Sequence, residues 1–520
     1  MMTLRTDPDT SIGRAMTEPT PTILIRGGRV YDHDGDVHEP ATADVLIAGD
    51  RIAAVGTGLP AGGATVIEAR GKLVIPGLVN AHYHSHDVLA KGLVEELPLE
   101  MWILMTGPLG GARSLEEVRL RTLAGAVEAL RNGITTVQDM STFAPFRDDV
   151  VDTILAAYEE AGIRVVYAVQ IRDLSNVTTV PFWKEVLPPA LQALVGNENV
   201  DPRPITNFVA AQIRRRPTPG PRGTWALGPS GPQRCTPAMI EAVVDLAERH
   251  DLPIYTHVYE TKAQALYARQ AFGEDGGTYL RYLDRLGMLG PRVTIAHGVW
   301  LAPEDIAMMA ERDVGLVMNF MSNLRLKSGI APIPTLRRAG VRLALGSDNC
   351  SCSDTQNIFQ AMKLYAMLNA VSDPAQTSLR APEALRLATL GGARTARLEN
   401  EIGAIRPGRK ADLAILDLAD PTFLPLNSVA RQLVYSETGR SVETVIVDGR
   451  IVVRDRRVTT VDVEALHREV AAYLPQFRRD LDTMAKAVEP ALPYVREAHR
   501  RIWAADVGFD RYAGFPRTFG

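Results

Sequence analysis

Cysteine is scarce in this sequence: only Cys235, Cys350 and Cys352 occur among 520 residues. Three cysteines cannot build the disulfide framework of a small secreted protein, which favours a reducing, cytoplasmic location. The chain also lacks an apolar run long enough to cross a bilayer, and its net charge of −4 provides no basic surface for nucleic acid or membranes. Residues 1–21 lack the apolar core of a signal peptide, so we expect them to form a disordered leader.

The long central part of the chain combines strand-like and helix-like patterns. Apolar residues make up 46% of the sequence and charged residues 23%, as in globular proteins. Across residues 78–395, apolar β-runs such as "ITTVQDM", "LPIYTHVYE" and "RVTIAHG" alternate with helical stretches such as "PAMIEAVVDLAERHD". This alternation predicts an α/β fold in which about eight parallel β/α units close a TIM barrel.

The two flanks of this central part differ from it. Residues 22–77 and 396–460 hold short β-like runs separated by glycine and aspartate turns. Each flank is too small to be a confident domain alone, so we expect the two to pair into one composite β-sandwich. Residues 461–520 form a helical, aromatic extension that we expect to dock on the barrel or on a second subunit, because a free tail would expose its aromatic rings.

Three of the ten histidines stand at alternate positions in the stretch "VNAHYHSHDVLAKG", residues 79–92. In an extended strand, residues two apart point the same way, so His82 and His84 could converge on one metal ion. His86 would lie about 13 Å along the chain from His82, too far to join the same ion unless the backbone folds back.

Other groups that bind metals or carry protons stand at or near the ends of further predicted strands. His257 ends "LPIYTH", with Glu260 three residues later; His297 ends "RVTIAH", and Asp348 ends "RLALGSD". Each alone has an ordinary structural explanation, such as a hydrogen-bonded core histidine or a helix-capping aspartate. Because a TIM barrel gathers the C-terminal ends of its strands on one face, the joint pattern predicts a metal site there.

The sequence resembles the amidohydrolase superfamily, in the branch that contains cytosine, guanine and adenosine-type deaminases and triazine chlorohydrolases. The motifs that carry the resemblance are "IPGLVNAHYH", "HVYET", "IAHGVWL", "SNLRLKSGIAPIPTLRRAGVRLALGSDN" and "ATLGGARTARLENEIGAIRPGRKADLAILD". They extend over nearly the whole chain, from about residue 22 to about residue 460. Together they are far more specific than any one of them alone.

The resemblance implies a set of roles. It implies that His297 contacts a metal-bound water and that Glu260 shuttles protons. Three imidazoles and one carboxylate suit Zn²⁺, or alternatively Fe²⁺, with an open position for water. The ligands implied for a single divalent ion are His82, His84, His257 and Asp348.

Three positions depart from the family pattern. Tyr83 stands where relatives often have threonine, His86 is additional, and Phe320 replaces a usual proline. We expect Tyr83 and His86 to line the substrate pocket. A second branch bridges two metals with a lysine on the fourth strand, but the corresponding segment here, "TWALGPSGPQRC", contains no lysine, which favours one metal.

The sequence also contains candidate substrate contacts, several of which have an ordinary structural alternative. Trp102 could equally be a core residue, and Arg234 a solvated rim residue, while Arg172 and Asp173 could simply pair with each other. The irregular insertion 174–222 is a candidate lid or subunit contact. The candidate substrate contacts are His86, Trp102, Gln233, Arg234 and Asn323.

The sequence therefore predicts a metal-dependent hydrolase, catalysing with Glu260, His297 and Asp348, that replaces an amino group at a trigonal carbon of a small heterocyclic substrate. Two alternatives use the same site: hydrolysis of an amide, urea or carbamate C–N bond, and hydrolysis of a chloro-heterocycle. A non-catalytic scaffold is disfavoured because every expected motif position is filled. The expected partners are a small-molecule substrate and further copies of this chain, as a homodimer or higher homo-oligomer.

Overall fold

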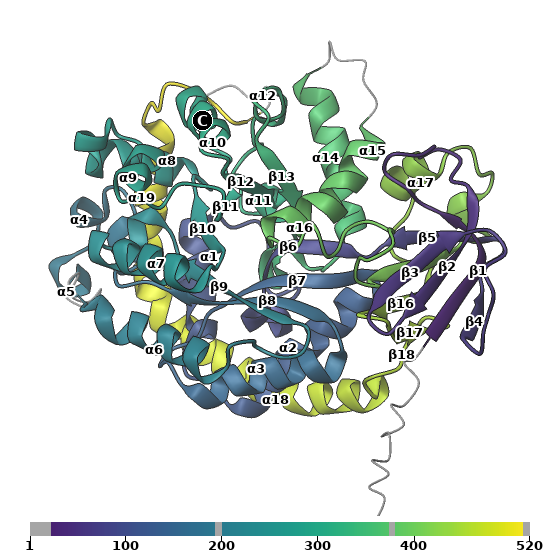
Figure 1. The fold of residues 1–520 in the computed structure, drawn as a ribbon. Coiled ribbons are helices and arrows are strands. Elements are labelled where there is room, and N and C mark those ends of the chain that lie inside the picture. The colour runs from purple at the N-terminus through teal and green to yellow at the C-terminus, as the bar shows by residue number, and fades with distance from the viewer. Residues whose placement is uncertain (1–21, 193–199, 374–379, 513–520) are drawn as a thin grey trace, which may run out of the picture.

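The computed structural model describes residues 22–192, 200–373 and 380–512 (Figure 1). The leader expected at residues 1–21 lies outside the described residues. In the described part of the chain, none of the helices combines the length and the apolar character that a membrane span requires.

One of the two nine-stranded sheets is a parallel barrel. Its strand order is β13-β12-β11-β10-β9-β8-β7-β6-β14, and every pairing is parallel. β14 continues the chain path of β13 and pairs with β6, so the last strand meets the first. The strands are β6 (Leu78–His84), β7 (Ile134–Ser141), β8 (Arg164–Ile171), β9 (Gly223–Pro229), β10 (Ile254–Val258), β11 (Val293–His297), β12 (Gly315–Met318), β13 (Arg342–Leu345) and β14 (Asp348–Asn349).

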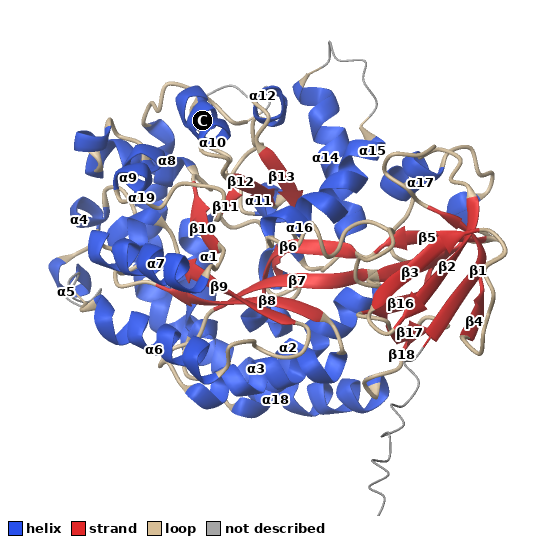
Figure 2. Ribbon diagram, in the orientation of Figure 1, coloured by secondary structure: helices blue, strands red, loops and turns tan. Residues whose placement is uncertain are grey.

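Helices surround this barrel (Figure 2), which explains why its strands are buried almost throughout and not on alternate residues. Side chains begin several of the helices: Ser114 accepts a hydrogen bond from the Glu117 backbone N–H, and Thr236 accepts one from the Met239 backbone N–H. The main helices of the barrel region are α2 (Leu115–Arg131), α3 (Asp148–Ala161), α6 (Pro202–Arg215), α7 (Pro237–His250), α8 (Lys262–Ala271), α9 (Tyr279–Arg285), α10 (Pro303–Glu311), α12 (Ile333–Arg338), α14 (Ile358–Ser372) and α15 (Ala381–Arg386).

The second sheet joins the two flanks of the chain, as the sequence predicts. Its order is β18-β17-β16-β15-β5-β1-β2-β3, with β4 beside β1, and the flanks meet where β5 pairs with β15. Arg164 of the barrel holds this sheet through bonds of 2.8 and 3.0 Å to the Asp412 carboxylate. The strands are β1 (Thr22–Val30), β2 (Thr42–Ala48), β3 (Arg51–Gly56), β4 (Thr65–Glu68), β5 (Lys72–Pro76), β15 (Leu413–Asp417), β16 (Val442–Val447), β17 (Arg450–Arg454) and β18 (Arg457–Val458).

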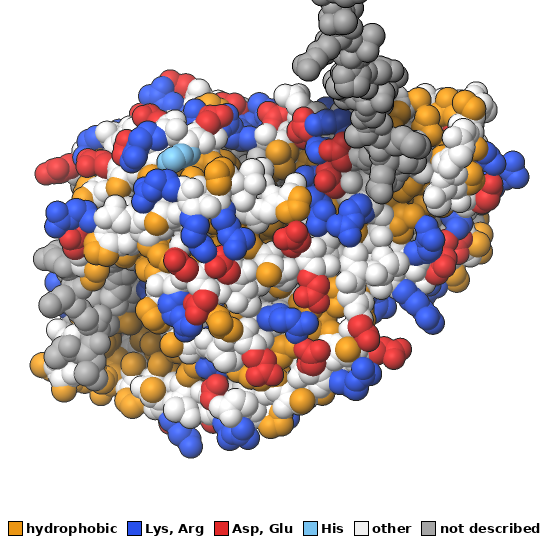
Figure 3. Space-filling view, turned by 60° about the horizontal axis from the view of Figure 1, so that its bottom comes forward, with side chains coloured by type: hydrophobic (Ala, Val, Ile, Leu, Met, Phe, Trp, Pro, Cys, Tyr) orange, Lys and Arg blue, Asp and Glu red, His pale blue; other side chains and the backbone are white. Residues whose placement is uncertain are grey.

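The C-terminal extension packs along the barrel as two helices, α18 (Val463–Val488) and α19 (Leu492–Ala504). Arg113 bonds Asp480 of α18 at 2.8 Å, and α19 packs against α1 (Leu99–Thr106) and α8. On the face drawn in Figure 3, cationic and anionic side chains are interspersed and do not gather into a field of one sign.

Candidate active site

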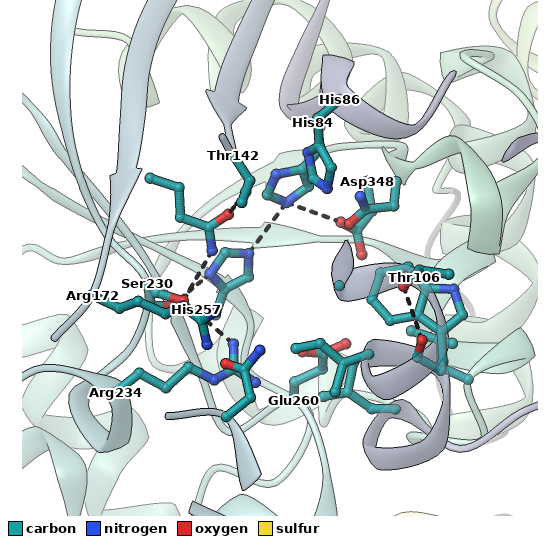
Figure 4. A pocket seen from close by; sticks show the side chains of 18 of the residues that line it. His84, His86, Thr106, Thr142, Arg172, Ser230, Arg234, His257, Glu260 and Asp348 are labelled. Atoms are coloured by element: carbon teal, nitrogen blue, oxygen red, sulfur yellow. Dashed lines mark hydrogen bonds and ion pairs between the residues drawn. The ribbon is translucent and has the colours of Figure 1, made fainter. Parts of the chain in front are cut away.

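Side chains from separate strands meet at the C-terminal end of the barrel. The Nε2 atoms of His82 and His84 are 3.2 Å apart, and those of His84 and His257 are 3.3 Å apart. Asp348 Oδ1 lies 3.4 Å from the Nε2 atoms of both His82 and His84. Two ligand atoms at 2.0–2.1 Å from a tetrahedral ion would be about 3.3–3.4 Å apart. The spacing of these atoms therefore fits a single tetrahedral metal ion, and Figure 4 shows three of the four residues.

Backbone carbonyls fix the rings of two of these histidines. His84 Nδ1 lies 2.6 Å from the Met140 carbonyl oxygen, and His257 Nδ1 lies 2.7 Å from that of Ser230. A carbonyl only accepts, so each Nδ1 carries the proton and each Nε2 turns a lone pair toward the centre. Burial, reinforced by the neighbouring histidines, holds the pKa of His257 well below its usual value, which favours the neutral form that a metal needs.

The backbone before Asp348 is shaped to present its carboxylate. A Cβ on Gly346 would lie 2.9 Å from the backbone nitrogen of His82, so the close approach of these strands requires glycine. Asp348 itself has a φ of +65°, a strained conformation for a residue with a side chain. Ser322 donates a hydrogen bond of 2.5 Å to Asp348 Oδ2, which fixes the carboxylate with Oδ1 toward the histidines.

His297 completes the polar cluster. Its Nδ1 lies 2.8 Å from Asn323 Oδ1, and its Nε2 lies 3.8 Å from Asp348 Oδ2. If the Asn323 oxygen accepts from Nδ1–H, the Nε2 lone pair faces the centre of the site. Asn323 thus lies behind His297, and it is not among the residues that line the cavity.

A cavity of about 730 Å³, including its open mouth, lies over this cluster. One wall is apolar, made by Leu99, Trp102 and Ile103 of α1 together with Leu326. The opposite wall is polar and consists of Thr142, Gln170, Arg172, Asn176, Ser230 and Arg234.

Only some of the predicted substrate contacts line the cavity. His86, Trp102 and Arg234 line the cavity, whereas Gln233 is buried and does not. Thr142 and Gln170 line it too and were not singled out from the sequence. Both lie at or next to the end of a barrel strand, which is the signal that could have found them.

Tyr83 does not line the cavity, contrary to expectation. It alternates with His82 and His84 along β6, so its side chain points to the opposite side of the strand. There it meets α2, where a Cβ on Gly125 would lie 2.1 Å from the Tyr83 hydroxyl. The glycine leaves room for the ring between barrel and helix.

His86 follows β6 in the short helical turn η1 (Ser85–Ala90) and faces the cavity (Figure 4). Its ring centre is 5.5 Å from that of His84, in an edge-on arrangement. Its buried Nδ1 has no hydrogen-bond partner among the residues that the structure describes. A buried polar atom without a partner that borders a cavity is placed to bond a ligand.

A parallel barrel with histidines and carboxylates gathered at its C-terminal strand ends defines the class of barrel hydrolases that work with a metal ion. The chain belongs to the amidohydrolase family, whose model matches residues 73–452. This confirms the sequence-based prediction of a metal-dependent enzyme that acts on carbon–nitrogen bonds other than peptide bonds.

Named relatives match most of the chain. It is 33% identical over 443 residues to the 5'-deoxyadenosine deaminase of Methanothermobacter thermautotrophicus, covering 85% of this chain and 95% of that protein. It is 34% identical over 438 residues to the 5-methylthioadenosine/S-adenosylhomocysteine deaminase of Thermococcus onnurineus, covering 84% and 95%.

Solved structures share the fold. An adenosine deaminase from Xanthomonas campestris with bound zinc has a TM-score of 0.73 at 28% identity, covering 89% of this chain and all of that one. The zinc complex of an atrazine chlorohydrolase from Arthrobacter aurescens TC1 has a TM-score of 0.75 at 27% identity, covering 86% and 99%.

Proposed function

We propose that this enzyme is a deaminase of adenine nucleosides modified at the 5' position. Water replaces the amino group on the purine: a C–O bond forms, the C–N bond breaks, and ammonia leaves. The observation that carries the proposal is the set of ligand atoms 3.2–3.4 Å apart beside a cavity that also contains Glu260. The deaminase names of the relatives support this choice of substrate.

We assign one divalent ion to the cluster, with Zn²⁺ preferred because two structural relatives hold zinc. When bound, such an ion lowers the pKa of a coordinated water to about 7, which makes hydroxide available at neutral pH. The ligands that we assign are His82, His84, His257 and Asp348.

Side chains of the protein then accept and donate the protons of the reaction. Asp348 Oδ2 faces the same centre as His297 Nε2, so the carboxylate can take the proton of the attacking water. His297, oriented by Asn323, can hydrogen-bond the attacking oxygen atom. Burial raises the pKa of Glu260 to about 7, so both of its protonation states are populated near neutrality. Glu260 can therefore protonate a ring nitrogen or the departing amine.

The cavity walls suit a flat, partly polar substrate. Trp102 and its neighbours on α1 provide an apolar surface on which a heterocycle can lie. His86, with its unpartnered Nδ1, is placed to hydrogen-bond the substrate from the side of β6. We assign His86, Trp102 and Arg234 to substrate binding.

We also propose a role for each segment of the chain and a location for the enzyme in the cell. We propose that residues 78–395 form the catalytic barrel, that 22–77 and 396–460 form the supporting β domain, and that 461–520 form an extension that braces the barrel. The buried, free cysteines favour a reducing, cytoplasmic location. The homodimer or higher homo-oligomer stays a prediction.

A second candidate is hydrolysis of a chloro-heterocycle, favoured by the structural likeness to the atrazine chlorohydrolase. Assays of ammonia release and of chloride release separate the two. The panel of test substrates contains 5'-deoxyadenosine, 5-methylthioadenosine, S-adenosylhomocysteine and adenosine, together with ureas, carbamates and chlorotriazines as alternative substrates. The proposal requires ammonia from at least one of the adenine nucleosides that are modified at the 5' position. Chloride release from a chlorotriazine, with no nucleoside deaminated, would replace it.

A further inference from the structure

Two arginines share the polar wall of the cavity. Arg172 directly follows β8, and Arg234 ends the turn η4 (Pro232–Arg234) after β9. The two loops are tied together, because the backbone N–H groups of Asp173 and Leu174 donate to the Arg234 carbonyl oxygen at 3.3 and 3.2 Å. Figure 4 shows both side chains entering the cavity from the same side, beside Ser230.

No carboxylate neutralises these arginines within the described part of the chain. Asp173, which the sequence suggested as a partner for Arg172, is occupied elsewhere: it accepts from the Thr236 backbone N–H at 2.9 Å and from the Thr236 hydroxyl at 2.5 Å. Arg234 makes one long contact, 3.4 Å from Nη1 to Ser230 Oγ, and its buried Nε has no partner in the same described residues.

The environment of the pair is unfavourable for two positive charges. Arg234 is buried, whereas Arg172 is exposed at the cavity mouth. Burial lowers the pKa of Arg234 from its ordinary value, so this arginine carries the cost of an unpaired charge. Buried guanidinium groups are normally paired, and an unpaired one is costly unless a ligand supplies the counter-charge.

The rest of this wall is neutral. Gln170 donates to Ser230 Oγ at 2.9 Å and accepts from the Thr142 hydroxyl, so these groups are satisfied among themselves. Glu260 is the acid whose charge acts most strongly on Arg234, but no ion pair within 4.0 Å joins them. The cavity thus has proton-transfer chemistry at one end and unneutralised positive charge on its polar wall.

We propose that Arg172 and Arg234 form an anion-binding subsite, and that the enzyme's substrate is an aminated heterocycle whose far end carries a carboxylate or a phosphate. The planar forks of the guanidinium groups match the oxygen atoms of both anions. This inference rests on the proposed deaminase function and adds the chemical class of substrate to it.

Three probe substrates separate the possible anions. S-adenosylhomocysteine carries a carboxylate, adenosine 5'-monophosphate a phosphate, and 5'-deoxyadenosine neither. The wild type should show a higher kcat/KM for one charged probe than for 5'-deoxyadenosine, and the preferred probe identifies the anion. The ratio of the two kcat/KM values should fall by roughly 10- to 100-fold in Arg172→Gln or Arg234→Gln, as for loss of a charged hydrogen bond. The variant Arg234→Lys, which keeps the positive charge, should retain part of the wild-type preference for the charged probe.

A matched control removes one positive charge elsewhere. Arg214 is exposed on α6, does not line the cavity, and its substitution by glutamine should leave the ratio unchanged. An unaltered ratio in the Arg172 and Arg234 variants, or a wild type that does not prefer either charged probe, would overturn the inference while leaving the deaminase function intact.

Binding without turnover tests the subsite independently. Calorimetry with the three deaminated products should give tighter binding of one of the charged products than of 5'-deoxyinosine, the product of the uncharged probe, and the difference should vanish in Arg234→Gln. If no probe is deaminated but this arginine-dependent binding persists, the proposed function fails and the anion subsite stands. If inorganic phosphate binds equally well to wild type and variant and neither product distinguishes them, the subsite is refuted.

Discussion

Glu260 Oε2 lies 3.7 Å from His297 Nε2, across the centre of the candidate active site. This separation is too long for a direct hydrogen bond but allows both groups to contact one substrate or water molecule. Glu260 is held in place by its backbone, whose N–H donates to Gln264 Oε1 at 2.8 Å. The carboxylate is therefore free to exchange its proton with a ligand.

The substitution Glu260→Gln should keep the fold and the bound metal but lower kcat by about 10²–10⁴, because an amide cannot donate and accept the transferred proton. Metal analysis, circular dichroism and steady-state kinetics on the same sample test this. Near-normal turnover in the variant would remove Glu260 from the mechanism.

The substitution His86→Ala should lower kcat/KM while metal content stays unchanged, because His86 lines the cavity and the proposed ligand set is complete without it. Metal content and kinetics are measured together. Loss of the metal would make His86 a ligand, and unchanged kinetics would make it a rim residue without a role.

The junction between barrel and β domain should be sensitive to acid through His33. Burial, and then the charge of Arg386, lower the pKa of His33 to about 4, and its Nε2 lies 3.0 Å from the Thr389 hydroxyl. Protonation thus favours the unfolded chain, in which the pKa is about 6.5. The contribution of neutral His33 to the free energy of unfolding is therefore fully present above pH 6.5 and is lost as the pH falls toward 4.

Denaturant unfolding of wild type and His33→Gln at several pH values tests this. Relative to the variant, the wild type should lose on the order of 1–3 kcal/mol between pH 6.5 and pH 4, since one pKa unit corresponds to about 1.4 kcal/mol. Parallel pH dependence in the two proteins would show that His33 is not responsible.

The C-terminal helix α19 should stabilise the apolar wall of the cavity through His499. The Trp503 indole N–H donates to His499 Nε2 at 2.5 Å, so the ring proton lies on Nδ1, 3.3 Å from Glu100 Oε2. Glu100 is buried on α1 and accepts from the Thr261 hydroxyl at 2.9 Å.

The substitution His499→Ala should lower the free energy of unfolding by about 1–3 kcal/mol, because a buried carboxylate loses a partner. It should also raise KM, since α1 carries Trp102. His467→Ala, at an exposed position on α18, is the matched control. Equal stability of the two variants would mean that the contact with Glu100 contributes nothing.

The histidines and carboxylates of the candidate site could be singled out from the sequence because they end, or closely follow, predicted barrel strands. Which of them bind a metal was implied only by the resemblance to the amidohydrolase superfamily. A histidine or aspartate that ends a parallel strand faces the C-terminal rim, so His257, His297 and Asp348 were placed by the strand pattern. Tyr83 was misplaced for a related reason: its position between two histidines drew attention, although strand alternation already directed it outward.

Other features depend on tertiary packing that no local pattern records. Glu100 and His499 are 399 positions apart, and only the docking of α19 on α1 brings them together. Asn323 could be identified as a candidate, but its place behind His297 depends on the short helix α11 (Phe320–Arg325) that follows β12. The sequence could not show that Arg172 lacks a carboxylate partner, because its neighbour Asp173 was a plausible one. In the structure, Asp173 instead accepts hydrogen bonds from Thr236.

The most direct test of the central claim is a zinc titration of the chelator-stripped enzyme, followed by ammonia release from its best adenine nucleoside substrate. Activity should be absent without metal, rise linearly, and reach its plateau at about one Zn²⁺ per chain, as expected for a single cluster of three imidazoles and one carboxylate. Full activity in the stripped protein, or a plateau that requires two tightly bound ions per chain, would contradict the account.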